Sequence, residues 1–514
     1  MNNTKQISKN ALFLYLRTGV SIIIQLIAVR YLLKYLGEDG YGLYGLIGSI
    51  VAILSSMRGL LSSSVQRFFN IAIGRKQDDV ICDIFNASLI IHVIIGLILA
   101  IGTLVMGLVL MPHLSIPTSY QSQAIWVLIF SALTMAVDVV SVPYSALLIA
   151  FERFNIYAFL SIIESVLKLG IVLILIIFPT GRVAIYAALL CGVAFIMRLA
   201  YVTAVKHKFR NLVKICKLKN TKLLKELSVF AGYKGIGTVA NAIQNSGINF
   251  ILNIFGGLIV NTARTISHQV LSAVNVLVWN INAAFVPRII TLYGENKIQE
   301  YTNLVISMTK FTFFINIVTG FSISILIHPI LNFWLGTIPP YTSGFIVLVF
   351  YYAIGRSLID GIDAVFSAEG KVKEFQFLIL GCMIVTLAGS WLMLKLGYSF
   401  YIAFSIMGIT ELTTSIGCYM LASKITSFNV KRIAREVLIP AGVLIIVYTI
   451  VGLVLGSIIP SSLNIFSLIM LFVTSMTSCG FCTVICLLNK KERHSLLKFI
   501  IRKYRNTFEK KESF

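Results

Sequence analysis

The stretch SVFAGYKGIGTVANAIQNSGINFILNIFGG, residues 228–257, is long and apolar enough to cross a lipid bilayer as a helix. It nevertheless carries one lysine and five amides, namely Lys234, Asn241, Gln244, Asn245, Asn249 and Asn253. At about 100° per residue, Lys234, Asn241 and Asn245 fall on one face of this helix. A membrane helix with one polar face predicts a helical bundle with a polar interior, because polar side chains are costly in lipid.

The composition of the whole chain agrees with this prediction. Of its 514 residues, 58% are hydrophobic and 12% are charged, whereas a soluble domain carries about 25% charged residues. Apolar runs of roughly 20 residues match the length of a membrane-spanning helix, and the shorter alternating strands of a barrel are not seen. We predict an all-α polytopic membrane protein with fourteen transmembrane helices, centred near residues 22, 50, 96, 136, 167, 192, 242, 275, 316, 352, 384, 410, 447 and 475.

The net charge of +23 is distributed unevenly between the two sides of the predicted membrane. With the N-terminus inside, 31 Lys and Arg residues lie on the inner side and four lie in outer loops. This positive-inside asymmetry predicts a multi-pass membrane protein with both termini cytoplasmic. The basic loop and tail are expected to contact anionic membrane lipids, so nucleic acid is not an expected partner.

The chain also contains an internal repeat at an offset of about 220 residues. LLKYLG (32–37) resembles ILNIFG (251–256), and VQRFFNIAIGRKQ (65–77) resembles VPRIITLYGENKI (286–298). Two pseudo-symmetric six-helix lobes are therefore expected, with a substrate path between them. The predicted organisation is an N-lobe with spans one to six at 1–205, a basic cytoplasmic linker at 206–227, a C-lobe with spans seven to twelve at 228–424, two appended helices at 425–488 and a basic cytoplasmic tail at 489–514.

Several predicted spans carry a basic residue on the same face as small polar residues. Arg17 shares a face of the first span with Gln25 at its edge, Arg58 lies in the second span, and Arg264 and Asn275 form a stripe in the eighth. A lone basic residue at a helix centre costs about 2.5–3.5 kcal/mol on insertion scales, so such residues usually face a wet interior or pair with an acid. A cavity-facing role is expected for Arg17, Arg58 and Lys234, while Arg264 either lines the cavity or reaches the nearby interface.

The chemistry of these side chains indicates a class of cargo. Guanidinium and ammonium groups bind phosphate, and amides match the hydroxyl groups of a sugar. The candidate substrate-binding residues are Arg17, Arg58, Lys234, Arg264, Asn241, Asn245, Asn275 and Gln25. Intramembrane acids are candidates for ion coupling, here Asp39, Asp138, Glu164 and Glu411, although Lys168 is expected to pair with Glu164 one turn away.

No cofactor, metal site or catalytic residue is expected. Cys479, Cys482 and Cys486 share a face of the last span, but they lack a histidine or carboxylate partner and are interpreted as packing residues. Asp360 and Asp363 border an inner loop, and Arg30 and Lys310 lie near span ends, where snorkelling or pairing with an acid is expected.

These features together resemble the polysaccharide-exporter branch of the MOP superfamily, the Wzx-type flippases of lipid-linked oligosaccharides. The residues that carry the resemblance are LGEDGYGLYGLI, SVQRFF, IAFERFNIYA and VNTARTISHQVLSAVN, which follow in that order along the chain. The resemblance implies a MOP/MATE-like pair of six-helix lobes with a central cationic cavity. It also implies transport of an undecaprenyl-pyrophosphate-linked oligosaccharide, the repeat unit of O-antigen or capsule, from the inner to the outer leaflet by alternating access. The membrane that the resemblance implies is the bacterial cytoplasmic (inner) membrane.

The same resemblance places some residues more closely. Arginines line the cavity in spans one, two and eight of the related lipid II flippases, and Arg17, Arg58 and Arg264 lie at similar places. Gln25 stands where that branch has a further arginine, and Asp39 is similar to its outer-loop aspartate. Coupling to an ion gradient is implied, and the polysaccharide polymerase or ligase machinery is an implied partner.

Two alternatives remain open from the sequence. A MATE-type multidrug exporter would be expected to carry acids in its first lobe for cationic cargo, where Arg17 and Arg58 stand instead, although Asp138 keeps this alternative open. A membrane enzyme, such as a polysaccharide polymerase or an acyltransferase, usually has a large outer loop or a His/Asp pair at catalytic spacing. The outer loops predicted here are short and the six histidines are scattered, so an enzyme is not expected.

Overall fold

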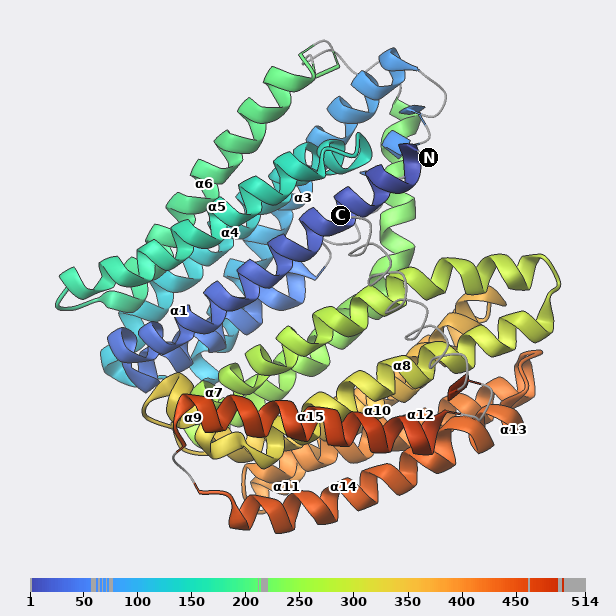
Figure 1. Cartoon of the computed structure of the whole chain (residues 1–514). Helices are drawn as coiled ribbons and strands as arrows, with labels where there is room; N and C mark the ends of the chain where they lie inside the picture. Colours follow the sequence, from blue (N-terminus) through green and yellow to red (C-terminus); the bar gives the residue numbers. More distant parts are fainter. Residues whose placement is uncertain are drawn as a thin grey trace, which may run out of the picture. The chain divides into compact units, whose positions relative to one another are not determined.

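The computed structural model describes the backbone of residues 2–56, parts of 62–73, 77–210, 212–213, 221–460, 463–488 and 492–493. Side chains are described within the same ranges, except for those of residues 2–16, 78 and 221–240. The regular secondary structure of these residues is entirely helical (Figure 1). This confirms the predicted all-α fold.

Eleven of the described helices are long and apolar enough to span a membrane. Two of them, α1 (Asn2–Ser55) and α7 (Thr221–Gly294), are bent at a glycine and so provide two spans each. A further helix of transmembrane length is α12 (Tyr401–Ile425). Together these helices account for all fourteen predicted spans, and the chain is a multi-pass membrane protein.

The two bends lie at equivalent positions of the internal repeat. Gly37 in α1 has φ 73° and ψ 174°, and Gly257 in α7 has φ 67° and ψ −161°. Glycine is suited to both positions because a side chain disfavours positive φ. The two residues are 220 positions apart, which is the offset found in the sequence. Backbone with positive φ also recurs at Glu152 and Gly370, and at Gly181 and Gly397.

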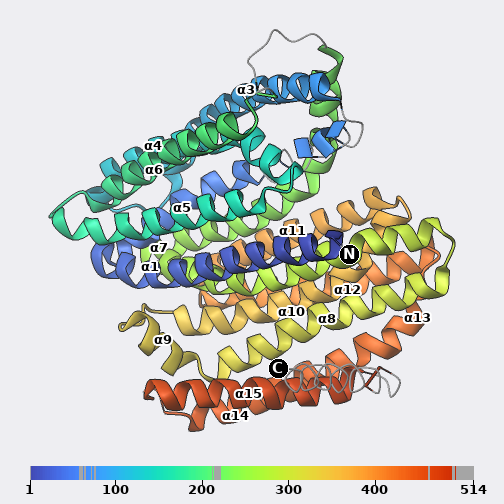
Figure 2. The same cartoon turned by 45° about the horizontal axis from the view of Figure 1, so that its top comes forward.

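The chain divides into two compact units, and the first comprises Met1–Ile266 and Leu387–Ala403. Its remaining helices are α3 (Asp78–Leu110), α4 (Thr118–Ala150), α5 (Phe154–Ile174) and α6 (Arg182–Lys208). Helix α4 packs between α3 and α6, and α5 packs along α1 (Figure 2). Buried apolar side chains such as Leu43, Phe85 and Leu147 fill the contacts inside this unit.

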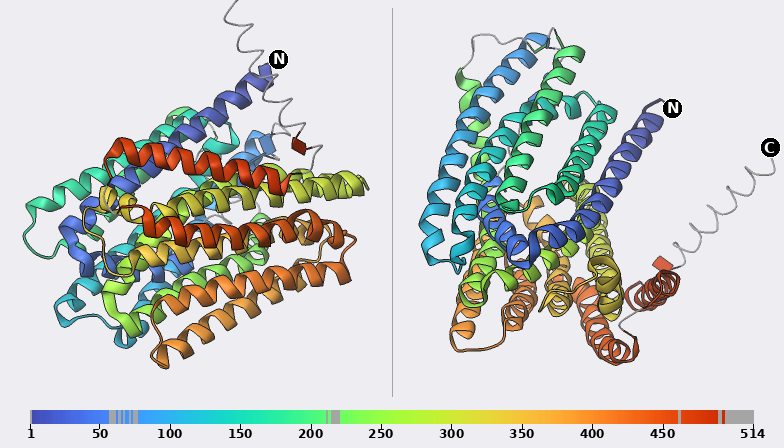
Figure 3. Two further views of the ribbon diagram at one scale, coloured as in Figure 1. Left: turned by 60° about the horizontal axis from the view of Figure 1, so that its bottom comes forward. Right: turned by 90° about the vertical axis from the view of Figure 1, so that its left-hand side faces the viewer.

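The second unit comprises Ser267–Thr386 and Phe404–Phe514. It contains residues 267–294 of α7, α8 (Ile298–Ile325), the short α9 (Ile327–Leu335), α10 (Thr342–Ala368), most of α11 (Val372–Lys395) and most of α12. Helices α14 (Ile439–Ile458) and α15 (Ile465–Leu487) both pack on α8 (Figure 3). A short α13 (Val430–Ile433) and a π-helical turn at Ala434–Leu438 lead into α14.

A buried lysine of α8 forms ion pairs with two glutamates from the C-terminal part of this unit. The side chain of Lys310 in α8 is 3% exposed, and its Nζ lies 2.8 Å from Glu492 Oε2 and 3.7 Å from Glu436 Oε2. The expectation that Lys310 pairs with an acid is thereby confirmed. The predicted lobe boundaries stay a prediction. Of the predicted basic linker, the described parts show α6 ending at Lys208 and α7 beginning at Thr221.

Candidate functional site

Three predicted site residues meet across the bend of α7. Because the chain reverses at Gly257, Arg264 on the second arm faces Asn245 on the first, and Arg264 Nη2 donates a hydrogen bond to Asn245 Oδ1 at 3.3 Å. Asn245 Nδ2 in turn donates to the backbone oxygen of Asn241 at 3.0 Å. Arg264 is only 2% exposed, so its guanidinium does not extend to the surface.

Arg17 belongs to a second polar cluster, between α1 and α5. Its Nη1 donates to the Tyr157 hydroxyl at 2.9 Å, and its guanidinium carbon lies 5.1 Å from the centre of that ring. One helical turn further along, the hydroxyls of Ser21 and Ser165 are 3.0 Å apart. Tyr157 therefore orients the guanidinium while leaving its positive charge in place. Sequence reasoning did not identify Tyr157, because its role depends on which helix packs against α1.

The other four predicted substrate-binding residues are Gln25, Asn275, Arg58 and Lys234. Gln25 and Asn275 are exposed, and Asn275 belongs to the second unit. Arg58 lies outside the described residues. Lys234 lies in the described part of helix α7, but its side chain is outside the described set. These four assignments stay predictions.

Two predicted coupling acids of the first unit, Glu164 and Asp138, lie near Lys168. Lys168 Nζ lies 2.6 Å from Glu164 Oε1, which confirms the predicted pair one helical turn apart. The charge of Asp138 also acts on Lys168. Asp39 is half-buried and follows the bend of α1 by two residues. A carboxylate held by a lysine is less available to a cation from solution, because the ammonium group already neutralises it.

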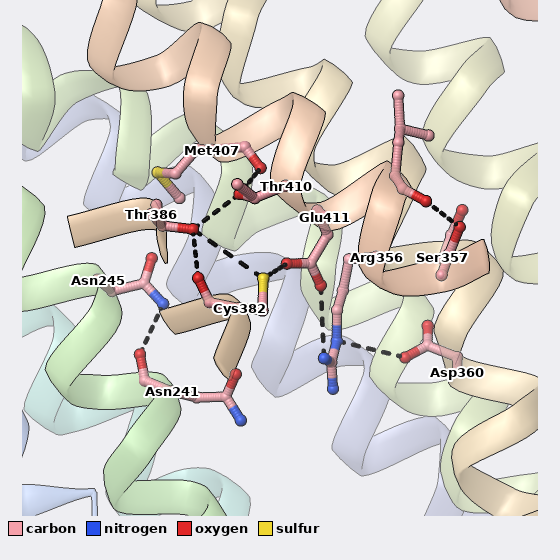
Figure 4. Close-up of polar contacts among 12 residues, drawn as sticks. Asn241, Asn245, Arg356, Ser357, Asp360, Cys382, Thr386, Met407, Thr410 and Glu411 are labelled. Atoms are coloured by element: carbon pink, nitrogen blue, oxygen red, sulfur yellow. Dashed lines mark hydrogen bonds and ion pairs between the residues drawn. The ribbon is translucent and has the colours of Figure 1, made fainter. Parts of the chain in front are cut away.

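A cluster of buried charges lies in the second unit, between α10, α11 and α12 (Figure 4). Arg356 Nη1 is 3.5 Å from Glu411 Oε1, and Arg356 Nε is 4.0 Å from Asp360 Oδ1. Glu411 is 3% exposed and Asp360 is 12% exposed. A side-chain hydrogen bond joins Asp360 to Asn282, and Asp363 also lies within electrostatic reach of Arg356.

Polar side chains continue this cluster away from the arginine. Cys382 Sγ lies 3.8 Å from Glu411 Oε2, and the hydroxyls of Thr386 and Thr410 are 2.7 Å apart (Figure 4). Sequence reasoning identified Glu411 but missed Arg356, and it placed Asp360 and Asp363 beside a loop. The i, i+4 spacing of Arg356 and Asp360 was the signal available in the sequence. Only the fold brings Glu411 to the same arginine.

The other amides of the opening stretch have a different environment from Asn241 and Asn245. Asn249 is 4% exposed and Asn253 is 0% exposed, and both bond to groups inside the first unit. Among the residues that the structure describes, no group of three or more His, Cys, Asp or Glu side chains is placed to hold a metal ion. Cys479 is buried, whereas Cys482 and Cys486 are exposed.

The fold matches that of known membrane transporters. No protein-family model and no curated protein matches the sequence. Among solved structures, an inward-facing multidrug resistance MATE transporter of the MOP superfamily matches 81% of this chain and 96% of its own, with a TM-score of 0.61 and 15% identity. The MATE multidrug transporter DinF-BH matches 82% of this chain and 95% of its own, with a TM-score of 0.60 and 15% identity.

An outward-facing MATE transporter of the same superfamily matches 82% of this chain and 96% of its own, with a TM-score of 0.55 and 14% identity. At such low identity these similarities establish the fold and not the cargo. The protein therefore has a MATE-like transporter fold. This agrees with the fold predicted from the sequence.

Proposed function

We propose that this protein is a transporter of the MOP superfamily that flips an undecaprenyl-pyrophosphate-linked oligosaccharide across the bacterial inner membrane. Transport proceeds by alternating access from the cytoplasmic leaflet, where both termini lie, to the outer leaflet. The sugar is a repeat unit of a surface polysaccharide such as O-antigen or capsule, which polymerase or ligase machinery then receives. The lipid tail stays in the bilayer while the charged and hydroxylated head passes through the protein.

The observation that carries this proposal is the environment of Arg17. In the part of the chain whose side chains are described, its guanidinium contacts the phenol of Tyr157 and forms no ion pair with a carboxylate. A guanidinium has five N–H donors, and one bond to a hydroxyl leaves others for a ligand. Its charge and planar geometry suit a phosphate group, which it can bind through paired hydrogen bonds.

The amides and Arg264 extend the same chemistry to a second helix. Asn245 provides a side-chain donor and acceptor beside a buried guanidinium, and its donor bonds to the backbone oxygen of Asn241. A sugar hydroxyl that loses water without a new partner costs about 1–3 kcal/mol on protein scales. Side chains that donate and accept hydrogen bonds can therefore replace the water that an oligosaccharide head loses as it crosses the membrane.

We further propose that the Arg356 cluster couples transport to a cation gradient. Asp360, Asp363 and Glu411 surround a single guanidinium, so their full ionisation would leave excess negative charge in a membrane interior. Each proton or monovalent cation that binds there would remove one unit of that excess. Glu411, which the sequence predicted as a coupling residue, thus becomes the main candidate. Glu164 and Asp138 are weaker candidates because Lys168 lies beside them.

A MATE-type exporter of cationic drugs is the second candidate, since the fold fits it equally well. The distinguishing feature is the charge that the cargo meets. A cationic cargo would meet Arg17 in the first unit, where Glu164 and Asp138 lie beside Lys168.

If the protein were instead a polymerase or an acyltransferase, incubation with lipid-linked substrate would yield longer or acylated products, which mass spectrometry would detect.

The proposal is tested with purified protein in proteoliposomes that contain a fluorescent lipid-linked oligosaccharide. Movement of the fluorophore between leaflets is followed by a membrane-impermeant quencher, and uptake of a cationic rhodamine dye is measured in parallel. We expect flipping of the lipid-linked sugar and no rhodamine transport. Rhodamine transport without lipid flipping would contradict the proposal and establish the drug exporter.

Variants of Arg17 connect the result to the structure. Loss of a charge-assisted hydrogen bond costs about 1.5–3 kcal/mol, so Arg17→Ala should lower affinity for an isoprenyl pyrophosphate roughly 10- to 150-fold. Arg17→Lys should retain part of this affinity because it keeps the charge. Ile23→Ala is the matched control from the same helix, since Ile23 is exposed, carries no charge and belongs to no predicted site. Equal affinity of Arg17→Ala and the unchanged protein would show that Arg17 does not bind the pyrophosphate.

A further inference from the structure

Helix α5 of the first unit carries an exposed ion pair well inside its membrane-spanning length. The side chains of Lys168 and Glu164 are 49% and 32% exposed, although about 9 Å of helix separates Lys168 from the C-terminal end of α5. Charged side chains in a membrane helix are costly in lipid, so the direction of this pair matters. The exposed apolar side chains of α5 define its lipid face, namely Phe159, Val166 and Leu173.

The ion pair points away from the lipid face of α5. At about 100° per residue, Lys168 and Glu164 each lie about 160° around the helix from Val166. In α4, Asp138 likewise lies about 180° from Ile129, which belongs to the exposed apolar face of that helix. The exposed surface of the pair is therefore on the side of α5 that packs toward α1, α4 and α6, and it is hydrated there.

Side chains from three other helices surround this pair. Lys168 Nζ lies 2.6 Å from Glu164 Oε1, and Asp138 of α4 and Tyr44 of α1 both lie within electrostatic reach of the ammonium group. Tyr44 is hydrogen-bonded to Tyr186 of α6, and the centres of the two rings are 5.0 Å apart with the planes inclined by 64°. We term these five residues the Lys168 site.

The charges of the Lys168 site select against ionic ligands of either sign. A cation is opposed by the ammonium group that already neutralises Glu164, and an anion is opposed by two carboxylates. A neutral hydroxyl group suits the site, because it accepts from the remaining N–H groups of Lys168 and donates to a carboxylate at the same time. The C–H faces of a sugar ring also pack well on the face of an aromatic ring, which is slightly negative.

The position of the site relative to Arg17 fits an extended cargo. Tyr157, which orients Arg17, and Lys168 are eleven residues apart in α5, so three helical turns place them on the same face of the helix. About 16 Å of helix separates them. One phosphate group cannot contact both positions, whereas the head of a lipid-linked oligosaccharide extends from its pyrophosphate through several sugar rings.

We propose that the Lys168 site binds a sugar ring of the cargo while Arg17 holds the pyrophosphate. This inference rests on the proposed function. Lys168 and Glu164 bond to neighbouring hydroxyl groups, and Tyr44 packs against the C–H face of the ring. Glu164 and Asp138 then serve the recognition of a sugar and not the coupling to an ion.

Reductive methylation of lysines tests the site in the unchanged protein. Purified protein in micelles is treated with formaldehyde and a mild reductant, and mass spectrometry measures methylation at each lysine. Lys168 should be methylated, because its side chain is half-exposed. Lipid-linked oligosaccharide extracted from the producing cells, at about ten times its Kd, should lower this methylation about 10-fold, and undecaprenyl pyrophosphate should not. Lys395 is exposed and Lys310 is 3% exposed, so they should react fully and not at all, whichever compound is present.

A paired substitution tests the same site through affinity. Glu164→Leu and Lys168→Met are combined, so that neither charge of the pair is left without the other. Affinity for the lipid-linked oligosaccharide should fall roughly 10- to 100-fold, and affinity for undecaprenyl pyrophosphate should stay the same. Arg17→Ala should weaken the binding of both compounds. The matched control combines Glu295→Leu and Lys297→Met, which removes an exposed ion pair of the second unit and should change neither affinity.

The outcomes separate the sugar site from the proposed function. Lys168 that resists methylation without ligand, or that undecaprenyl pyrophosphate protects equally well, would overturn the sugar site. Binding of the lipid-linked oligosaccharide without protection of Lys168 would overturn the sugar site and keep the proposed cargo. Failure of both compounds to bind the unchanged protein would refute the cargo, and the sugar site with it.

Discussion

Replacement of Arg356 by methionine provides a direct test of the buried charge cluster. The guanidinium lies 3.5 Å from Glu411 and 4.0 Å from Asp360, and Glu411 is 3% exposed. Methionine keeps much of the apolar stem and removes the charge. Glu411, Asp360 and Asp363 would then remain in the bundle without the arginine, so the free energy of unfolding should fall.

The size of the loss follows from the geometry. At an effective dielectric constant of about 20, two unit charges at 3.5 Å attract each other by about 5 kcal/mol. The arginine side chain is 27% exposed, which weakens this attraction, and desolvation offsets another part of it. Removal of one partner from a buried pair usually costs about 3–5 kcal/mol. We expect Arg356→Met to lie near the lower end, at about 3 kcal/mol.

The assay is chemical unfolding in detergent micelles, performed on Arg356→Met, Glu411→Gln and the double variant. The double variant should be more stable than Arg356→Met, because a neutral amide replaces the carboxylate that has lost its arginine. Arg432→Met is the matched control. It removes an i, i+4 pair with Glu436 whose arginine is 31% exposed, and it should cost about 0.5 kcal/mol.

If Arg356→Met and Arg432→Met lower the free energy of unfolding by the same amount, the charges of the Arg356 cluster do not act as an electrostatic unit. Strict additivity of Arg356→Met and Glu411→Gln in the double variant would lead to the same conclusion, because residues that interact directly should not be additive.

Two further predictions concern packing in the second unit. Lys310→Met should destabilise the protein by about 1–2 kcal/mol, because Glu436 and Glu492 lose the cation that they share. The loss is limited because these two side chains are 18% and 34% exposed and can be partly hydrated. Unfolding in micelles measures the change, and an unchanged stability would refute the role of the lysine. Gly361→Ala should cost about 1–3 kcal/mol, since its Cβ would lie 2.0 Å from Thr309 Oγ1. Gly381→Ala is its control, because nothing lies within 4 Å of the added Cβ, and equal thermal stability of the two variants would contradict the packing argument.

Hydropathy and the internal repeat predicted the fold because both are properties of the chain itself. A run of about 20 apolar residues has one main structural outcome in a membrane. The bends at Gly37 and Gly257 were not predicted, but they are separated by the same offset of about 220 residues as the two copies of the repeat. The pair of Glu164 and Lys168 was predictable for a similar reason, because one helical turn separates them.

The site was less predictable because it depends on which helices become neighbours. A helical projection places Asn245 and Asn249 close together on α7, yet Asn245 bonds to Arg264 and Asn249 bonds to α1. Likewise, Arg356 and Glu411 are 55 residues apart, and no local pattern connects α10 to α12. The sequence therefore indicated which residues are polar and buried, but not whether they face cargo, an ion or another helix.

The bend at Gly257 also has a consequence for biosynthesis. Arg264 and Asn245 are 19 residues apart, and Asn261 and Asn249 are 12 apart, so both contacts close within a single helical hairpin. This hairpin can enter the membrane with its arginine and amides already hydrogen-bonded, before the following helices have been synthesised. Insertion of this polar hairpin then does not have to wait for the rest of the bundle. Its internal hydrogen bonds reduce the cost of placing a guanidinium in lipid before the following helices are present.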